Sequence, residues 1–148
     1  MNEASKTLLV NTVKEWNKFV AEREKLTGVA NEIAAQARKC ISESIIFLKA
    51  QNVEAQGEDI STMHILNVPV TVEPIIETTF PVVKGSVLLK CGGATRMIII
   101  NPNLSISAGG TPFMFEQFKK GIPETFMTNA ADFVRDAFLN AARTGGKE

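Results

Sequence analysis

The sequence is poor in the residues from which catalytic and metal sites are most often built. His64 is the only histidine, Cys40 and Cys91 are the only cysteines, and there is no tyrosine. A zinc site needs clustered cysteine or histidine ligands, and a serine or cysteine nucleophile would depend on His64, which no known motif surrounds. We therefore expect no catalytic residue, no metal and no cofactor, and we predict that the protein is not an enzyme.

The sequence also lacks a net charge. Sixteen basic residues balance sixteen acidic ones, so nothing attracts the chain as a whole to nucleic acid or anionic lipid. No glycine-rich loop leads from a strand into a helix with a lysine, as nucleotide-binding motifs require. The phenylalanines occur at core spacing and not among basic residues, unlike the stacking platforms of RNA-binding domains. Nucleic acid is thus disfavoured as a partner.

Long apolar runs are missing as well. No stretch approaches the eighteen apolar residues of a membrane span, and the N-terminal MNEASK does not have the form of a signal peptide. Cys40 and Cys91 stand far apart in unlike contexts, which favours free thiols in a reducing compartment over a disulfide. We expect a cytoplasmic protein that does not enter a membrane, with Cys40 buried and Cys91 the more accessible thiol.

Proline is absent before Pro69, and the stretch in front of it carries the strongest pattern in the chain. Between residues 5 and 50, apolar residues recur in alternating steps of four and three, which predicts one long amphipathic helix. Only three residues of this seam are not apolar. The seam consists of Leu9, Val13, Trp16, Val20, Arg23, Thr27, Ala30, Ala34, Ala37, Ile41, Ser44 and Leu48.

Such a helix is too long for a compact domain. At 1.5 Å per residue it measures roughly 68 Å, whereas a domain of this size has a radius of gyration of about 15 Å. Gly28 is the only candidate break, but the apolar phase continues unshifted across it. A continuous helix, which can be bent, is therefore favoured over two antiparallel helices joined at Gly28.

From residue 60 to residue 107 the apolar period changes from 3.6 to 2, which predicts an antiparallel meander of four or five strands. Its clearest part is a hairpin of residues 85–91 and 94–101 around Gly92-Gly93. Prolines within residues 68–83 favour the edge of the sheet for that segment. Apolar residues on both sides of 95–101 predict that both faces of the sheet centre are covered, by the long helix, by the C-terminal helices or by a second subunit.

The remaining chain, residues 111–143, predicts two helices. Thr111-Pro112 has the form of a helix start, and Gly121 is expected to take a left-handed cap at the end of that first helix. The second helix is expected to begin near Asn129 and to end at Gly145-Gly146. The whole chain, residues 1–148, is thus predicted to form a single α+β domain.

The long helix also provides the functional hypothesis. Its N-terminal half extends past the reach of one core, and exposed apolar side chains usually mark an interface. We therefore expect a non-catalytic interaction or assembly protein, such as an adaptor or a binding inhibitor, that forms a homodimer or a higher symmetric oligomer and binds a protein partner. A ligand-binding or enzymatic domain with a pocket between helix and sheet is the alternative, and a nucleic-acid-binding protein is the second alternative. The expected interface consists of Leu9, Val13, Trp16, Phe19, Val20 and Arg23.

Overall fold

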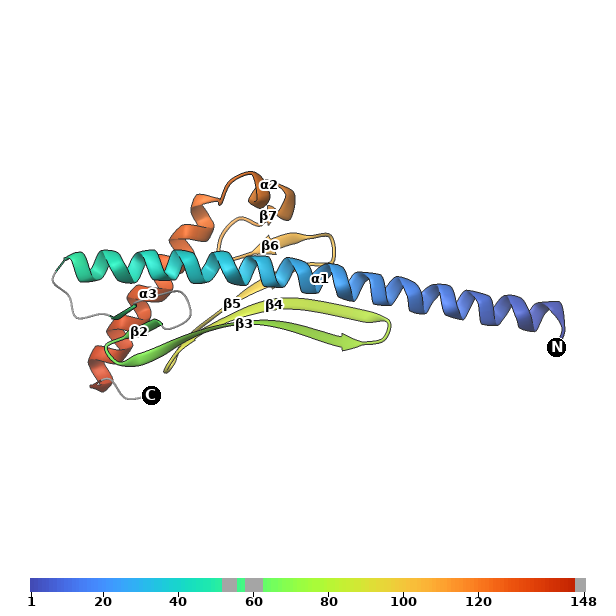
Figure 1. Ribbon diagram of the computed structural model, residues 1–148, viewed down its shortest axis with the longest axis horizontal. Helices are drawn as coiled ribbons and strands as arrows, with labels where there is room; N and C mark the ends of the chain where they lie inside the picture. Colours follow the sequence, from blue (N-terminus) through green and yellow to red (C-terminus); the bar gives the residue numbers. More distant parts are fainter. Residues whose placement is uncertain (52–55, 58–62, 146–148) are drawn as a thin grey trace.

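One long helix, one antiparallel sheet and two further helices make up the structure (Figure 1), a computed structural model that describes residues 1–51, 56–57 and 63–145. The expected sheet start at Ile60 and the expected end at Gly146 lie outside these residues. The elements are α1 (Glu3–Ala50), β1 (Gln56–Gly57), β2 (Met63–Ile65), β3 (Val68–Thr79), β4 (Val82–Cys91), β5 (Ala94–Ile100), β6 (Ser105–Ser107), β7 (Phe113–Met114), α2 (Phe115–Lys120) and α3 (Glu124–Thr144).

Helix α1 is continuous over its 48 residues, which corresponds to about 72 Å. It begins after Asn2, whose side-chain oxygen accepts a hydrogen bond from the backbone N–H of Ser5 at 2.8 Å. Gly28 does not interrupt it, because a single glycine costs a helix only about 1 kcal/mol and the apolar face continues on both sides. The prediction of one unbroken helix is confirmed.

The described strands form one sheet in sequence order, β1 to β7, with every neighbouring pair antiparallel. The predicted α+β meander is confirmed, although short strands at both ends raise the number above the four or five expected. The placement of residues 68–83 at the sheet edge is only partly right. Strand β3 lies between β2 and β4, but β2 pairs only with residues 68–70. Beyond them, Arg38 of α1 donates a hydrogen bond to the carbonyl oxygen of Val72 at 2.8 Å.

The β4–β5 hairpin has the predicted register, with Cys91 opposite Ala94 and Leu89 opposite Arg96. One face of this hairpin packs under α1 and α3. The other face is open in the single chain, where Met97 and Ile99 are about half exposed. In the described part of the chain, the helices thus cover one face of the sheet centre, and cover of the other face by a second subunit stays a prediction.

The two C-terminal helices exist and end where predicted, but both begin at other residues than predicted. Thr111-Pro112 precedes a short strand, and α2 begins only at Phe115. Gly121 ends α2 in an extended conformation, with φ 178°, so it makes no left-handed cap. Helix α3 begins at Glu124 behind Pro123, five residues before the expected Asn129. Its left-handed end at Gly145, with φ 70°, matches the prediction.

The core lies between the covered face of the sheet and the helices α1 and α3 (Figure 1). Helix α1 contributes its residues from Phe19 onward, and α3 contributes Phe126, Phe133 and Val134. Phenylalanines from β7, α2 and α3 pack ring against ring beside this core, with centroids 5.1 to 6.3 Å apart. Among the described residues, no helix combines the length and the apolar character that crossing a membrane requires.

Candidate interaction surfaces

The first surface is the N-terminal arm, which we define as residues 3–18 of α1. The arm runs past the end of the β3–β4 hairpin, as the blue part of the helix in Figure 1 shows. Its seam residues Leu9, Val13 and Trp16 are 53%, 56% and 48% exposed. The arm therefore presents to solvent the same kind of apolar seam that the sheet covers farther along α1.

The arm begins where three aromatic rings meet. Phe19 of α1 packs edge to face against Phe80 of the β3–β4 turn, with ring centroids 5.2 Å apart. Trp16 lies 5.3 Å from Phe19 and 5.8 Å from Phe80 by the same measure. Phe19 is buried, whereas Trp16 and Phe80 are about half exposed. The exposed seam of the arm is thus continuous with an exposed ring at the hairpin tip.

The structure divides the six expected interface residues into two groups. Leu9, Val13 and Trp16 are available to a partner. Phe19 belongs to the core, Val20 packs partly against it, and the guanidinium of Arg23 lies 5.7 Å from the centre of the Phe19 ring. A partner on the arm can therefore use the first group, together with Phe80, which the sequence did not indicate.

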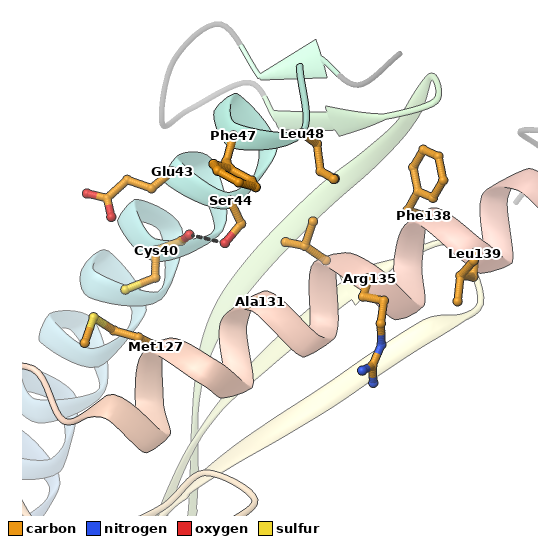
Figure 2. A pocket seen from close by; sticks show the side chains of 11 residues that line it. Cys40, Glu43, Ser44, Phe47, Leu48, Met127, Ala131, Arg135, Phe138 and Leu139 are labelled. Atoms are coloured by element: carbon orange, nitrogen blue, oxygen red, sulfur yellow. Dashed lines mark hydrogen bonds between the residues drawn. The ribbon is translucent and has the colours of Figure 1, made fainter. Parts of the chain in front are cut away.

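The second surface is an apolar groove of about 400 Å³ between the C-terminal end of α1 and helix α3. Figure 2 shows Phe47 and Leu48 on the α1 side and Met127, Phe138 and Leu139 on the α3 side. We call it the α1–α3 groove. It is lined by Cys40, Glu43, Ser44, Phe47, Leu48, Met127, Ala131, Val134, Arg135, Phe138 and Leu139.

The polar groups of this groove are largely occupied. The Ser44 hydroxyl donates to the carbonyl oxygen of Cys40 at 3.0 Å (Figure 2). Arg135 is paired with Asp132 and Asp136 at 3.5 and 3.3 Å. Burial, with a smaller contribution from Glu43, raises the pKa of the Cys40 thiol. The groove therefore offers a hydrophobic contact surface and no activated nucleophile among its described residues.

A smaller polar hollow of about 250 Å³ lies beside the start of α3. Arg96, Asn129 and Asp132 line it, together with the backbone of Gly109-Gly110. Arg96 donates to Asp136 at 2.7 Å, and this hydrogen bond lowers the pKa of the Asp136 carboxyl. Since the arginine is already paired with an acidic side chain, the described lining of the hollow offers no unpaired cation to hold an anion.

The single histidine does not complete a catalytic group. His64 lies in β2, partly buried, opposite Gln56 and Pro69. In the described part of the chain, no group of three histidine, cysteine or acidic residues is placed to hold a metal ion. Cys40 and Cys91 are both buried.

The expected order of thiol exposure is wrong. Cys91 is 1% exposed, and its thiol lies 3.7 Å from the carbonyl oxygen of Val68, within donor distance. The glycine turn that follows Cys91 does not expose it, because the residue faces the core side of the hairpin. Cys40, at 9%, lies at the edge of the α1–α3 groove.

The sequence reasoning missed the α1–α3 groove, although a signal for it exists. Helix α3 carries a second apolar stripe, Met127, Ala131, Phe138 and Leu139, beside the buried face that includes Phe133. A helix with two apolar stripes has more hydrophobic surface than one core contact needs. Comparisons with protein-family models, curated proteins and solved structures find no match, so the functional argument rests on the geometry of these surfaces.

Proposed function

We propose that this protein is a non-catalytic interaction or assembly protein that associates with itself through the N-terminal arm of α1. The observation that carries the proposal is the exposed seam Leu9–Val13–Trp16, which projects beyond the sheet on a rigid helix. Contiguous exposed apolar side chains favour a protein interface. A tryptophan at the centre of such a surface is the residue type that most often dominates binding energy.

The chemistry of the described residues agrees with a binding role. The pKa of the Cys40 thiol is raised, away from reactivity, and the 2.7 Å ion pair of Arg96 with Asp136 joins a strand to a helix. An enzyme would be expected to show grouped acids, bases or nucleophiles with shifted pKa values in a cleft. The α1–α3 groove gives the protein a second apolar surface, which supports a role as an adaptor between copies of itself and another molecule.

The test is the mass of the native protein by multi-angle light scattering. Wild type should have a multiple of 16.1 kDa at high micromolar concentration. Trp16→Glu should be a monomer with an unchanged circular dichroism spectrum, because Trp16 is half exposed and the charge need not be buried. Met97→Glu, an equally exposed apolar residue on the open face of the sheet, is the control and should keep the wild-type mass. A wild-type mass of one chain at every concentration would contradict the proposal.

A second candidate function is the binding of an apolar small molecule, which the α1–α3 groove favours. Its volume of about 400 Å³ lies in the range of small-ligand sites. A ligand that binds only the folded state raises the melting temperature by mass action. A thermal-shift screen with fatty acids and other apolar metabolites would detect it, and Phe138→Asp should abolish any shift that arises in the groove.

A further inference from the structure

We infer that Arg38 of α1 and Pro74 of β3 together keep the outer edge of β3 closed to an additional strand. The inference is independent of the arm. In the described part of the chain, β2 pairs with β3 only from Val68 to Val70, so residues 71–79 have β4 on one side and no described strand on the other. We call this side of residues 71–79 the β3 edge. A strand edge of this kind is a template for pairing with another chain.

The register shows which residues turn their backbone groups toward the β3 edge. In an antiparallel sheet, successive residues direct their N–H and C=O groups alternately to the two sides of the strand. Thr79 and Val82 flank a two-residue turn and are paired with each other, so Thr79 faces β4. The residues that face the edge are then Val72, Pro74, Ile76 and Thr78. The hydrogen bond that the Val72 carbonyl oxygen accepts from Arg38 agrees with this direction.

Arg38 occupies the first of these positions. Its Nη2 atom donates to the carbonyl oxygen of Val72 at 2.8 Å, close to the distance of about 2.9 Å at which the amide nitrogen of a neighbouring strand would lie. The guanidinium therefore takes the place of that amide. Arg38 is partly buried and comes from α1, which packs against β3. An added strand would have to displace a side chain that the helix holds against the edge.

Pro74 blocks the next position. Proline has no N–H, and its ring takes the place from which that group would donate to an added strand. An ordinary residue at this position would form two ladder hydrogen bonds, whereas Pro74 can form only one through its carbonyl oxygen. Pro69 of the same strand has no such effect on the edge, because the alternation turns its nitrogen to the β4 side, past the last β3–β4 pair at Val70.

The part of the edge that stays open is short. Only Ile76 and Thr78 face it with both backbone groups available, and a typical strand has about five to six residues. Glu73 and Glu77 are exposed on the same strand, and charges of one sign on an edge oppose its pairing with a second copy. We conclude that Arg38 and Pro74 leave too few backbone groups for stable strand addition.

Replacement of both residues tests this inference. Arg38→Met frees the Val72 carbonyl oxygen and keeps an apolar stem, and Pro74→Val restores an N–H at the edge. Both are placed in a Trp16→Glu background, so that the result does not depend on association through the arm. By multi-angle light scattering, the mass of the combined variant should rise with concentration to at least twice 16.1 kDa, whereas the background should keep its own mass.

A matched control carries Lys39→Met and Pro69→Val in the same background. Lys39 is the exposed basic residue next to Arg38, and Pro69 is the proline that faces away from the β3 edge. This control loses one basic residue and one proline, as the test variant does, but leaves Arg38 and Pro74 in place. It should keep the mass of the background at every concentration.

Amide hydrogen exchange identifies the surface that associates and shows whether the variant is folded. In the background, the N–H groups of Ile76 and Thr78 face the edge and should exchange fast, while those of Ile75 and Glu77 face β4 and should exchange slowly. In the associated variant, the amides of Ile76 and Thr78 should become protected. The β4–β5 hairpin should keep its protection.

Two results would overturn the inference. One is a folded variant that keeps the mass of the background, and the other is association that leaves the Ile76 and Thr78 amides in fast exchange, because another surface would then be responsible. If Arg38→Met unfolds the chain, seen as lost protection in the β4–β5 hairpin, Pro74→Val alone decides. It frees three successive edge-facing residues and should still associate at high concentration with protected Ile76 and Thr78 amides, so a monomer would again overturn the inference.

Discussion

The Phe19 and Phe80 rings meet edge to face with centroids 5.2 Å apart, at the point where the sheet stops covering α1. Phe19 is 5% exposed although its neighbour Trp16 is 48% exposed. Within one helical turn, α1 thus changes from a part that is buried in the fold to a part that is exposed and free for a partner. This boundary gives the first prediction.

Phe19→Ala should destabilise the protein by about 3 kcal/mol, because it removes a buried ring and leaves a cavity beside Phe80. Val10→Ala should change the unfolding free energy by less than about 0.5 kcal/mol, since Val10 is half exposed and lies off the seam. Urea unfolding at low protein concentration measures both values. Equal losses would mean that the arm is part of the cooperative fold.

The second prediction concerns Gly109, where two features of the structure disfavour any side chain. Its φ is +81°, and an added Cβ would lie 2.7 Å from the side-chain nitrogen of Asn129. Gly109→Ala should therefore cost about 1 to 3 kcal/mol of stability. Gly121→Ala is the control, because Gly121 has an extended backbone and no atom within 4 Å of the added Cβ. A melting temperature unchanged in Gly109→Ala would contradict this account.

Gly109 and Asn129 also show why the start of α3 could not be predicted correctly from the sequence. Asn129 followed by Asp132 has the form of a helix start, yet Asn129 lies inside α3 and its side chain approaches Gly109, twenty residues earlier. Pro123 ahead of Glu124 is the real start. The local pattern at Asn129 could not reveal that its side chain lies beside Gly109.

The long helix and the central hairpin could be predicted because their signals are local and repeated. The seam from Leu9 to Leu48 runs through eleven steps, and Gly92-Gly93 specifies both a turn and a register. Burial was harder to predict from the same patterns. Cys91 was expected to be accessible because it adjoins the turn, but the register puts it on the core face of the hairpin opposite Ala94.

The candidate surfaces were predicted in part. The exposure of Leu9, Val13 and Trp16 followed from comparing the helix length with the size of a core, which is an argument about dimensions. Phe80 could not be added to that surface from the sequence, since its contact with Trp16 depends on where the β3–β4 hairpin ends. The α1–α3 groove depends on how α3 crosses α1, which the second apolar stripe of α3 does not specify by itself.

Thiol labelling gives the third prediction. With a maleimide under native conditions, Cys40 should react slowly and Cys91 more slowly still, because Cys91 is the more deeply buried. Burial raises the pKa of the Cys40 thiol, so its reactive thiolate is scarce at neutral pH and increases about tenfold per pH unit as pH rises toward the raised pKa. Mass spectrometry of labelled peptides at pH 7 and 8 measures both rates. Faster labelling of Cys91 would contradict the burial described above.

The fourth prediction concerns the Arg96–Asp136 pair, which joins β5 to α3. The hydrogen bond from Arg96 lowers the pKa of Asp136, so the stability it contributes is present above the ordinary aspartate pKa and is lost as pH falls through the lowered value. In Arg96→Gln, the carboxyl should titrate closer to the ordinary value by NMR. Arg135→Gln should move it less, because Arg135 contacts Asp136 at 3.3 to 3.4 Å and not at 2.7 Å. A larger shift in Arg135→Gln would reverse this assignment.

The fifth prediction separates the α1–α3 groove from the core beneath it, using two phenylalanines. Phe47 is 64% exposed at the rim of the groove, whereas Phe133 of α3 is fully buried. Phe133→Ala should lower the unfolding free energy by about 3 to 5 kcal/mol, and Phe47→Ala by less than about 1 kcal/mol. If the groove binds apolar molecules, the fluorescence of an environment-sensitive dye such as ANS should increase with wild type and much less with Phe47→Ala.

A third variant, Ile46→Ala, is the control for dye binding. It removes an exposed side chain next to Phe47 that does not line the groove and should leave dye binding unchanged. Equal dye binding by wild type and both of these variants would show that the groove is not the apolar site, and loss of stability in Phe47→Ala would show that its ring supports the fold.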